Sequence, residues 1–176
     1  MVRKLNSKGF TLVELLAVIV ILALVLVLTI PNVLNAMNNS RVSSIHSKAK
    51  SVANWYSESI LADGLTTNEA DKIIPTAIAN QVTGTWKCFG DFTASGGTTL
   101  SDLAELTSAD FVLTGTAPNA TPSSTNVGAT TCSAIRQTTG GKVEVILVGT
   151  TNGKFAVGGG TVYAWSEDTN GMVVSS

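Results

Sequence analysis

The clearest pattern in the chain is an apolar run near its N-terminus. Phe10 to Ile30 contains a single charged residue, Glu14, and almost no polar groups. As an α-helix at about 1.5 Å per residue, this run extends for roughly 31 Å, which matches the roughly 30 Å hydrocarbon core of a bilayer. We therefore expect a helix that is apolar on every side and long enough to cross a membrane.

A second pattern begins after Pro31 and indicates that the helix continues. Apolar residues recur at spacings that place them on one stripe of a helix, and this stripe consists of Leu34, Met37, Ile45, Val52, Tyr56 and Ile60. Asp63-Gly64 is typical of a helix C-terminus. Proline in a helix interior removes a hydrogen bond and bends the axis. We predict one helix from Phe10 to Ala62, bent or loosened between Pro31 and Ser40, whose amphipathic half packs on a globular head.

The last third of the chain has the pattern of an antiparallel sheet. Lys142 to Gly149 reads as a strand with Val143, Val145 and Leu147 on one face. Asn152-Gly153 is the preferred two-residue hairpin turn. The strands expected after it lie at 154–157, 161–165 and 172–174. A meander of three or four strands with one face on the long helix gives an α+β fold.

Weaker signals in the middle of the chain predict short elements. Thr66-x-x-Glu69 matches a capping box, and Pro75 limits the helix that would begin there. Ser101 is the expected N-cap of a short helix that reaches Leu106. Two short strands and a loop complete the prediction, at 85–92, 111–113 and 114–131. Asn119-Ala120-Thr121 in this loop fits a glycosylation pattern, although an ordinary turn that contains Asn119 is the better explanation.

Charge changes the interpretation of the apolar run. Arg3, Lys4 and Lys8 precede it without any acidic residue, so this end is expected to stay in the cytoplasm. A plain single-pass anchor explains the hydropathy but not Glu14, because a carboxylate in a membrane segment needs a positive partner. If the chain were cut after Gly9, the new amine on Phe10 would lie one helical turn away. Two such charges about 4 Å apart attract by roughly 4 kcal/mol before desolvation is subtracted.

The residues from Lys8 to Leu16, Lys-Gly-Phe-Thr-Leu-Val-Glu-Leu-Leu, closely resemble the class III signal of type IV pilins and of secretion and competence pseudopilins. The resemblance covers about residues 3–37. It implies that a prepilin peptidase cuts between Gly9 and Phe10 and N-methylates Phe10. It also implies that Glu14 pairs with the amine of an adjacent subunit, and the family commonly has a proline where Pro31 stands. The expected parts are a leader at 1–9, a transmembrane and assembly helix at 10–63, and a head at 64–176.

The resemblance also implies a function and partners. The expected function is that of a structural subunit of an extracellular type IV pilus, which serves adhesion, motility or aggregation. Its expected partners are further copies of the chain, the prepilin peptidase and methyltransferase, the pilus assembly platform, and the cytoplasmic membrane before assembly. The sequence names no host or surface receptor. Two alternatives stay open: a pseudopilin of a type II secretion or competence system, and a membrane-tethered binding or enzymatic domain that never polymerises.

The remaining candidate chemistry is sparse. Cys88 and Cys132 match no metal-binding spacing, and on the exported side they form either a disulfide or two reduced thiols. His46 has no acid or nucleophile at a catalytic spacing. Three acidic residues, Asp102, Glu105 and Asp110, are better explained as a solvated surface than as a calcium site. The formal net charge of −1 does not favour nucleic-acid binding. We expect no enzyme activity, metal or cofactor.

Overall fold

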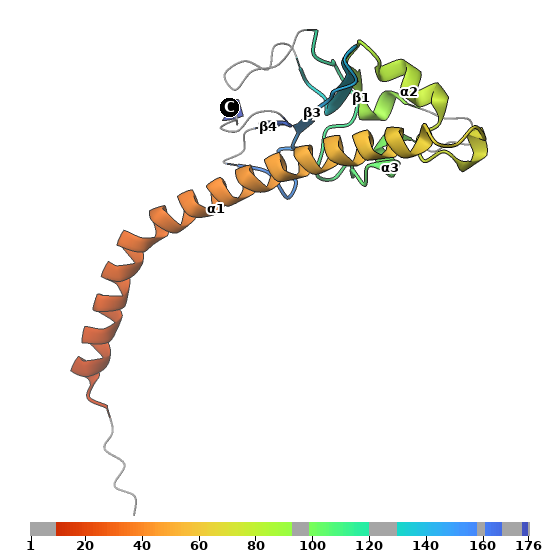
Figure 1. Cartoon of the computed structure of the whole chain (residues 1–176). Helices are drawn as coiled ribbons and strands as arrows, with labels where there is room; N and C mark the ends of the chain where they lie inside the picture. The colour runs from red at the N-terminus through yellow and green to blue at the C-terminus, as the bar shows by residue number, and fades with distance from the viewer. Residues whose placement is uncertain (1–9, 93–98, 120–129, 158–160, 167–173, 176) are drawn as a thin grey trace, which may run out of the picture. The chain divides into compact units, whose positions relative to one another are not determined.

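The computed structural model describes residues 10–92, 99–119, 130–157, 161–166 and 174–175. It divides the chain into two compact units, 1–39 and 40–176, and the division falls inside the long helix α1, Leu12–Asp63. The second unit, which we call the head, combines the C-terminal part of α1 with two short helices and an antiparallel sheet (Figure 1). The chain therefore has the α+β architecture that the sequence predicts.

The helix α1 runs without a break through Pro31 and ends one residue beyond the predicted Ala62. Its buried residues begin at Ile45, and the predicted stripe is confirmed there: Ile45, Val52 and Tyr56 are almost fully buried in the head. The first part of the stripe is different, since Leu34 and Met37 are exposed. That the helix axis bends near Pro31 stays a prediction.

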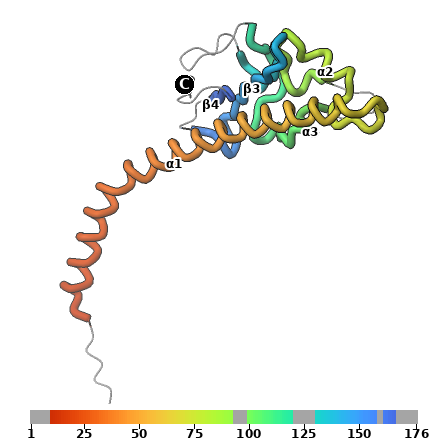
Figure 2. The backbone as a smooth tube through the Cα atoms, viewed as in Figure 1, coloured from red at the N-terminus to blue at the C-terminus, as the bar shows by residue number. Residues whose placement is uncertain are grey.

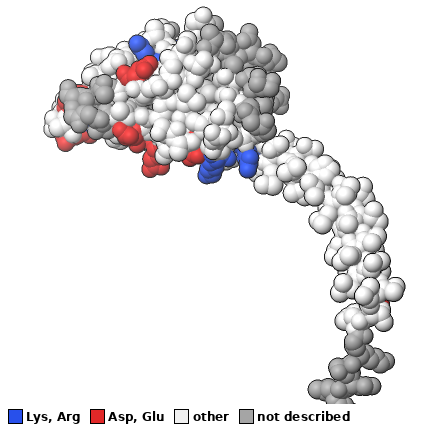
Figure 3. Space-filling model, turned by 180° about the vertical axis from the view of Figure 1, so that it is seen from behind, with Lys and Arg blue, Asp and Glu red and all other residues white. Residues whose placement is uncertain are grey.

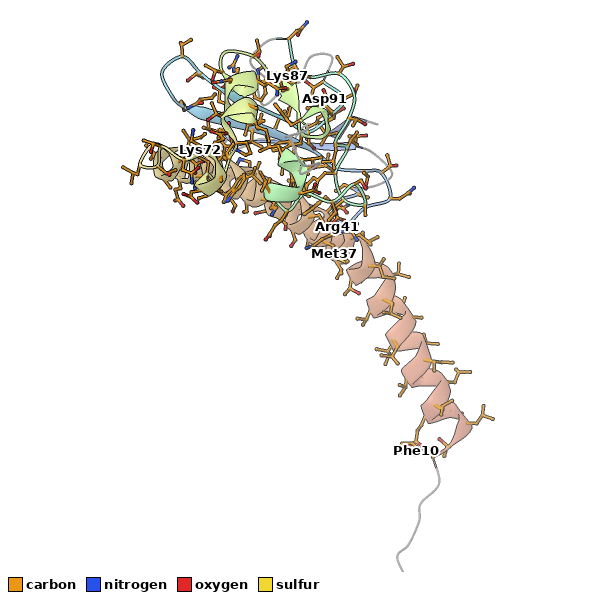
Figure 4. All side chains as sticks on the ribbon, turned by 90° about the vertical axis from the view of Figure 1, so that its right-hand side faces the viewer. Phe10, Met37, Arg41, Lys72, Lys87 and Asp91 are labelled. Carbon is orange, nitrogen blue, oxygen red and sulfur yellow. A yellow bond between two sulfur atoms is a disulfide. The ribbon has the colours of Figure 1, made fainter. Side chains whose placement is uncertain are left out.

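The first unit consists of the apolar part of α1. Its large apolar side chains from Phe10 to Met37 are about half or more exposed. They project on all sides of the helix, as the view with side chains shows between these two labelled residues (Figure 4). Figure 3 shows almost no charged surface on this stretch. A helix that is apolar all round is stable only when lipid or other apolar helices surround it.

The sheet of the head is a meander of five antiparallel strands in sequential order. The strands are β1 (Lys87–Cys88), β2 (Ala134–Gln137), β3 (Val143–Val148), β4 (Thr161–Trp165) and β5 (Val174–Ser175). In the longest pairing, Ala134 of β2 lies opposite Ile146 of β3, which in turn lies opposite Trp165 of β4. The strand β2 has no counterpart in the sequence prediction. The tube view follows the chain through these turns (Figure 2).

Side chains alternate across the sheet and build two apolar layers. On β3, Val145 and Leu147 join the main core with the buried face of α1, as predicted, whereas Ile146 joins a smaller cluster on the opposite face. The same alternation on β4 sends Val162 to the main core and Trp165 to the smaller cluster. The period of two residues is the one expected of a strand with both faces covered.

The predicted hairpin at Asn152-Gly153 is wrong. Residues 150–156 form turns and no strand, and β3 pairs directly with β4. The reason is a competing set of hydrogen bonds to Asp110. Its backbone carbonyl accepts from Thr150 N at 3.0 Å, and its carboxylate accepts from Lys154 N at 3.0 Å. Of the predicted edge strand 172–174, only Val174 lies among the described residues.

Two helix starts also differ from the prediction. No capping box forms at Thr66, because Glu69 instead accepts hydrogen bonds from Thr76 N and Oγ1 at 2.6 and 2.7 Å. Asn68 caps a single 3-10 turn there. An unpredicted helix, α2, follows at Thr76–Val82. The N-cap of α3, Leu100–Leu103, is Thr99 and not Ser101.

The two short strands expected in the middle of the chain are mostly absent. Only Lys87–Cys88 of the predicted strand 85–92 is extended, and a 3-10 turn follows at Phe89–Asp91. In place of a strand at 111–113, Phe111 forms one isolated bridge to Gly149. Most of the expected loop at 114–131, including the second and third residues of the glycosylation pattern, lies outside the described residues.

Candidate assembly site at the start of the long helix

The first turn of α1 is organised by reciprocal hydrogen bonds between Thr11 and Glu14. One carboxylate oxygen of Glu14 accepts from Thr11 N at 2.9 Å and from Thr11 Oγ1 at 2.8 Å. In return, Thr11 Oγ1 accepts from Glu14 N at 3.3 Å. This is the geometry of a capping box, in which two N–H groups that have no partner within the helix are satisfied. Glu14 is therefore held against the backbone at the helix start.

The sequence contains the signal for this cap, although the prediction missed it. Thr11-x-x-Glu14 has the capping-box spacing directly before an apolar run. The carboxylate also lies at the positive end of the helix dipole, which favours a negative charge in the first turn. Together these contacts explain how an isolated carboxylate is accommodated at the start of an otherwise apolar helix. They involve one of its two oxygens in the described part of the chain.

Phe10 immediately precedes this cap and is strongly exposed, with 88% of its surface accessible. Gly9, the residue before the predicted cleavage point, lies outside the described residues together with the basic leader. The helix that follows is long and apolar enough to cross a membrane, since its most apolar 18-residue window has a mean hydropathy of 3.2. The cut would thus release an amine one residue before the Thr11 and Glu14 cap.

The two cysteines lie in the head and not at the assembly site. Cys88 of β1 and Cys132, two residues before β2, form a disulfide with their Cα atoms 5.8 Å apart. Both are fully buried in the smaller apolar cluster beside Trp86. The bridge links two segments that are 44 residues apart in the sequence. Its role in the structure is to hold the edge strand β1 against the start of its neighbour β2.

Two of the three acidic residues considered as a calcium site, Asp102 and Asp110, have separate structural partners. Asp102 completes the capping box of α3 with Thr99, and the hydroxyl and backbone N–H of Thr99 hold the pKa of Asp102 below its ordinary value. Asp110 accepts from Lys154 N. Glu105 has a positive φ of 53°. Over the described ranges, no group of three or more His, Cys, Asp or Glu side chains is placed to hold a metal ion, and His46 is half-buried on α1.

Comparison with known proteins identifies the N-terminal segment. Residues 4–30 match the model of the prokaryotic N-terminal methylation motif, which is the class III signal of type IV pilins and pseudopilins. No curated protein and no solved structure matches the chain. The motif implies processing by a prepilin peptidase and assembly in a pilus or secretion system, and together with the apolar helix it fits a membrane-anchored precursor.

Proposed function

We propose that the chain is the structural subunit of an extracellular type IV pilus. A prepilin peptidase cuts it between Gly9 and Phe10, Phe10 is N-methylated, and the mature subunit polymerises. One observation carries this proposal: the methylation motif at 4–30 includes the beginning of the continuous helix α1, and the part of α1 in the first unit exposes its apolar side chains on all sides. We also propose that this role is structural and not enzymatic.

Hydrophobic burial supplies the reason to polymerise. The apolar part of α1 requires lipid or similar helices around it. When subunits leave the membrane, these helices can cover one another, and each square ångström of apolar surface removed from water contributes about 25 cal/mol. The apolar side chains of the first unit are about half or more exposed in the single subunit, so outside the membrane the covering helices come from other copies. A fibre with the apolar helices at its centre satisfies this requirement.

The pair of Phe10 and Glu14 gives the fibre its register. The Glu14 carboxylate is fixed in direction by Thr11, so a correctly stepped neighbour can bring the amine of its Phe10 to it. An incorrectly stepped neighbour would leave both charges in an apolar interior, which costs several kcal/mol. The pairing therefore selects one axial step between neighbouring subunits.

Two other functions predict different observations. A pseudopilin has the same signal but forms a short fibre in the cell envelope. The part of the chain after α1, residues 64–176 with a length of 113 residues, favours a pilin over the smallest pseudopilins. Immunolabelled electron microscopy of cells separates long surface fibres from short envelope fibres. A tethered binding or enzymatic domain keeps its leader and never polymerises.

The mature N-terminus is the test of the proposal. Mass spectrometry of the protein purified from its own host should show a chain that begins at Phe10 and carries one additional methyl group. A Gly9→Val variant, in which the small residue before the cut is replaced, should stay uncut and remain in the membrane. An intact Met1 on the native protein would reject the proposal, whatever the behaviour of the variant.

A further inference from the structure

The head displays a small apolar surface at the C-terminal end of α1. Among the described residues of 40–176, three large apolar side chains are exposed to solvent: Leu61, Leu65 and Ile73, with 74%, 91% and 46% of their surface accessible. All three lie in the last turn of α1 or in the connection to α2. We call these three residues the tip patch. Lys72, which directly precedes Ile73 in the sequence, is labelled in Figure 4.

The connection that carries the tip patch is held by hydrogen bonds. The Asp63 carboxylate is buried and accepts from the backbone N–H groups of Ile73 and Ile74 at 2.7 and 2.8 Å. Further along, Glu69 accepts from both donors of Thr76. A segment fixed in this way loses little conformational entropy when it binds a partner. Leu65 is therefore an apolar side chain presented to solvent on a preorganised connection.

Charges are distributed unevenly between the part of α1 that belongs to the head and the segment that follows it. Residues 40–57 of α1 contain Arg41, Lys48 and Lys50 and no acidic residue. Residues 58–73, which are the end of α1 and the connection to α2, contain the buried Asp63 together with Glu58, Glu69 and Asp71, against Lys72 alone. Figure 3 shows basic side chains at one end of the lower edge of the head and acidic side chains along the rest of it. The basic stretch of one head is thus complementary in charge to the tip of another, and a second copy is the partner that this pattern fits.

A receiving surface lies beside the basic stretch. A groove of about 220 Å³ separates α1 from α3, and its lining includes Lys48, Ser51, Val52, Trp55, Leu103 and Glu105. Three of these residues are apolar or aromatic, and Lys48 and Glu105 bring one charge of each sign to the groove. We call it the α1–α3 groove. Its volume accommodates a leucine side chain together with neighbouring atoms.

We propose that the tip patch of one subunit docks in the α1–α3 groove of a neighbouring subunit, with Leu65 against Trp55 and Asp71 near Lys48. This inference rests on the proposed filament. The patch and the groove are different surfaces of one chain, so the contact is head-to-tail and repeats along a fibre instead of closing into a dimer. Leu65 follows the end of α1 at Asp63, and Trp55 lies 8 positions before that end, so docking Leu65 against Trp55 displaces the two copies by at least about 12 Å along the helix axis.

Cysteine cross-linking tests the contact in assembled fibres. Ser51 is exposed in the groove, so a chain with both Ser51→Cys and Leu65→Cys should give a ladder of covalent multimers when sheared fibres are oxidised and run without reductant. Each single variant should give monomers, because one of the two partners is then missing. Fibres of the double variant that yield no ladder would overturn the proposal. The Cys88 and Cys132 bridge lies within one subunit and adds no multimer.

A charge exchange tests the same contact without cysteines. It is the test of the docking if the double cysteine variant forms no fibres. Asp71→Lys should reduce the yield of sheared fibres about tenfold, since like charges then meet at Lys48. Adding Lys48→Asp in the same chain should restore most of it. A normal yield from Asp71→Lys, or no restoration, would contradict the docking.

Cleavage and fibre formation of the wild type show whether the proposed function or only the docking has failed. If wild-type protein is not cut before Phe10 and forms no fibres, the proposed function fails. If wild-type fibres form and the Leu61→Ser, Leu65→Ser double variant forms as many, the docking fails alone. Fibres of that variant that are normal in number but no longer attach to cells would assign the tip patch to an external partner, which also overturns the docking.

Discussion

Thr11 donates both its backbone N–H and its hydroxyl to one carboxylate oxygen of Glu14, over 2.9 and 2.8 Å. The same carboxylate is the group that the proposed function pairs with the amine of a neighbouring Phe10. Glu14 would therefore act first as a helix cap in the precursor and then as a counter-charge in the fibre. These two roles need different properties of the side chain, because a cap needs an acceptor and a counter-charge needs a negative charge.

Glu14→Gln and Thr11→Val separate the two roles. Glutamine keeps an acceptor for Thr11 but loses the charge, so we expect membrane insertion to be normal and the fibre yield to fall about tenfold or more, equivalent to at least 1.4 kcal/mol of lost pairing. Valine keeps the charge of Glu14 and removes the hydroxyl, which costs about 1 kcal/mol of helix capping and should leave most fibres. The measurement is the ratio of sheared fibres to membrane-bound subunit. Equal fibre yields from wild type and Glu14→Gln would show that the charge of Glu14 is not needed for assembly, and that Glu14 acts as a helix cap.

Asp63 should be one of the most sensitive positions of the head. Its buried carboxylate satisfies the N–H groups of Ile73 and Ile74, and Asp63→Ala would leave both without this acceptor. Hydrogen bonds to a charged group contribute about 1.5–3 kcal/mol each, so we expect the free energy of unfolding to fall by about 3 kcal/mol. Urea denaturation of the detergent-solubilised chain, followed by tryptophan fluorescence, measures it. Asn54→Ala, at an exposed position of α1, should change it by less than about 0.5 kcal/mol.

The elements that the sequence predicts well are those with long and regular periodicity. The course of α1 follows from an apolar run, a stripe through Ile45 and Tyr56, and Asp63-Gly64 at its end. The strands β3 and β4 follow from their alternation. In each case many residues contribute to the same pattern, so a single residue that departs from the pattern does not change the predicted element. The methylation motif has the same property, because its basic leader, its Gly9-Phe10 junction and its glutamate occur together.

The elements that the prediction missed depend on single contacts. Thr99 and Ser101 both suit an N-cap, and the choice falls on Thr99 because Asp102 lies three residues after it and returns its hydrogen bond. Asn152-Gly153 is a strong hairpin signal, yet the contacts of Asp110 with Thr150 and Lys154 prevail. Asp110 is 40 or more residues away from them in the sequence, so no local pattern reveals this competition. At the assembly site, the residues were predictable but their geometry was not.

Tyr56 allows a stabilising substitution to be predicted. Its side chain is fully buried, and its hydroxyl has no hydrogen-bond partner in the described part of the chain. Burial raises the pKa of this phenol, with a further contribution from Asp63, so the hydroxyl stays protonated. An unsatisfied buried hydroxyl is destabilising. We expect Tyr56→Phe to leave the free energy of unfolding unchanged or to raise it by up to about 1 kcal/mol in the same urea assay. A loss above 1 kcal/mol would reveal a partner for the hydroxyl.

The disulfide should be a major source of stability for the head. Cys88 and Cys132 enclose a loop with a sequence separation of 44, for which the loss of chain entropy in the unfolded state corresponds to about 4 kcal/mol. The Cys88→Ser, Cys132→Ser double variant should lower the free energy of unfolding by about that amount. Wild type measured with reductant is the matched control and should approach the variant. If reductant leaves the wild-type midpoint unchanged, the bridge is not formed in solution.

Glu69 provides a test that depends on pH. Its carboxylate accepts from the hydroxyl of Thr76, contacts Lys72 at 2.9 Å, and accepts from the backbone N–H of Thr76. These contacts lower the pKa of Glu69 from an ordinary 4.5 to about 2. Because the pKa in the folded state lies below that in the unfolded state, the stabilisation is fully present above about pH 4.5 and is lost as the pH falls toward 2.

Comparing wild type with Glu69→Gln across this range isolates the contribution of the carboxylate. At pH 7 the urea midpoint of the variant should be lower than that of wild type, and the difference should shrink between pH 4.5 and pH 2. Glu58→Gln removes the same charge from an exposed position of α1 and serves as the control, since it removes none of the contacts with Thr76 and Lys72. A difference between wild type and Glu69→Gln that stays constant from pH 7 to pH 2 would show that these contacts do not act through the ionised carboxylate.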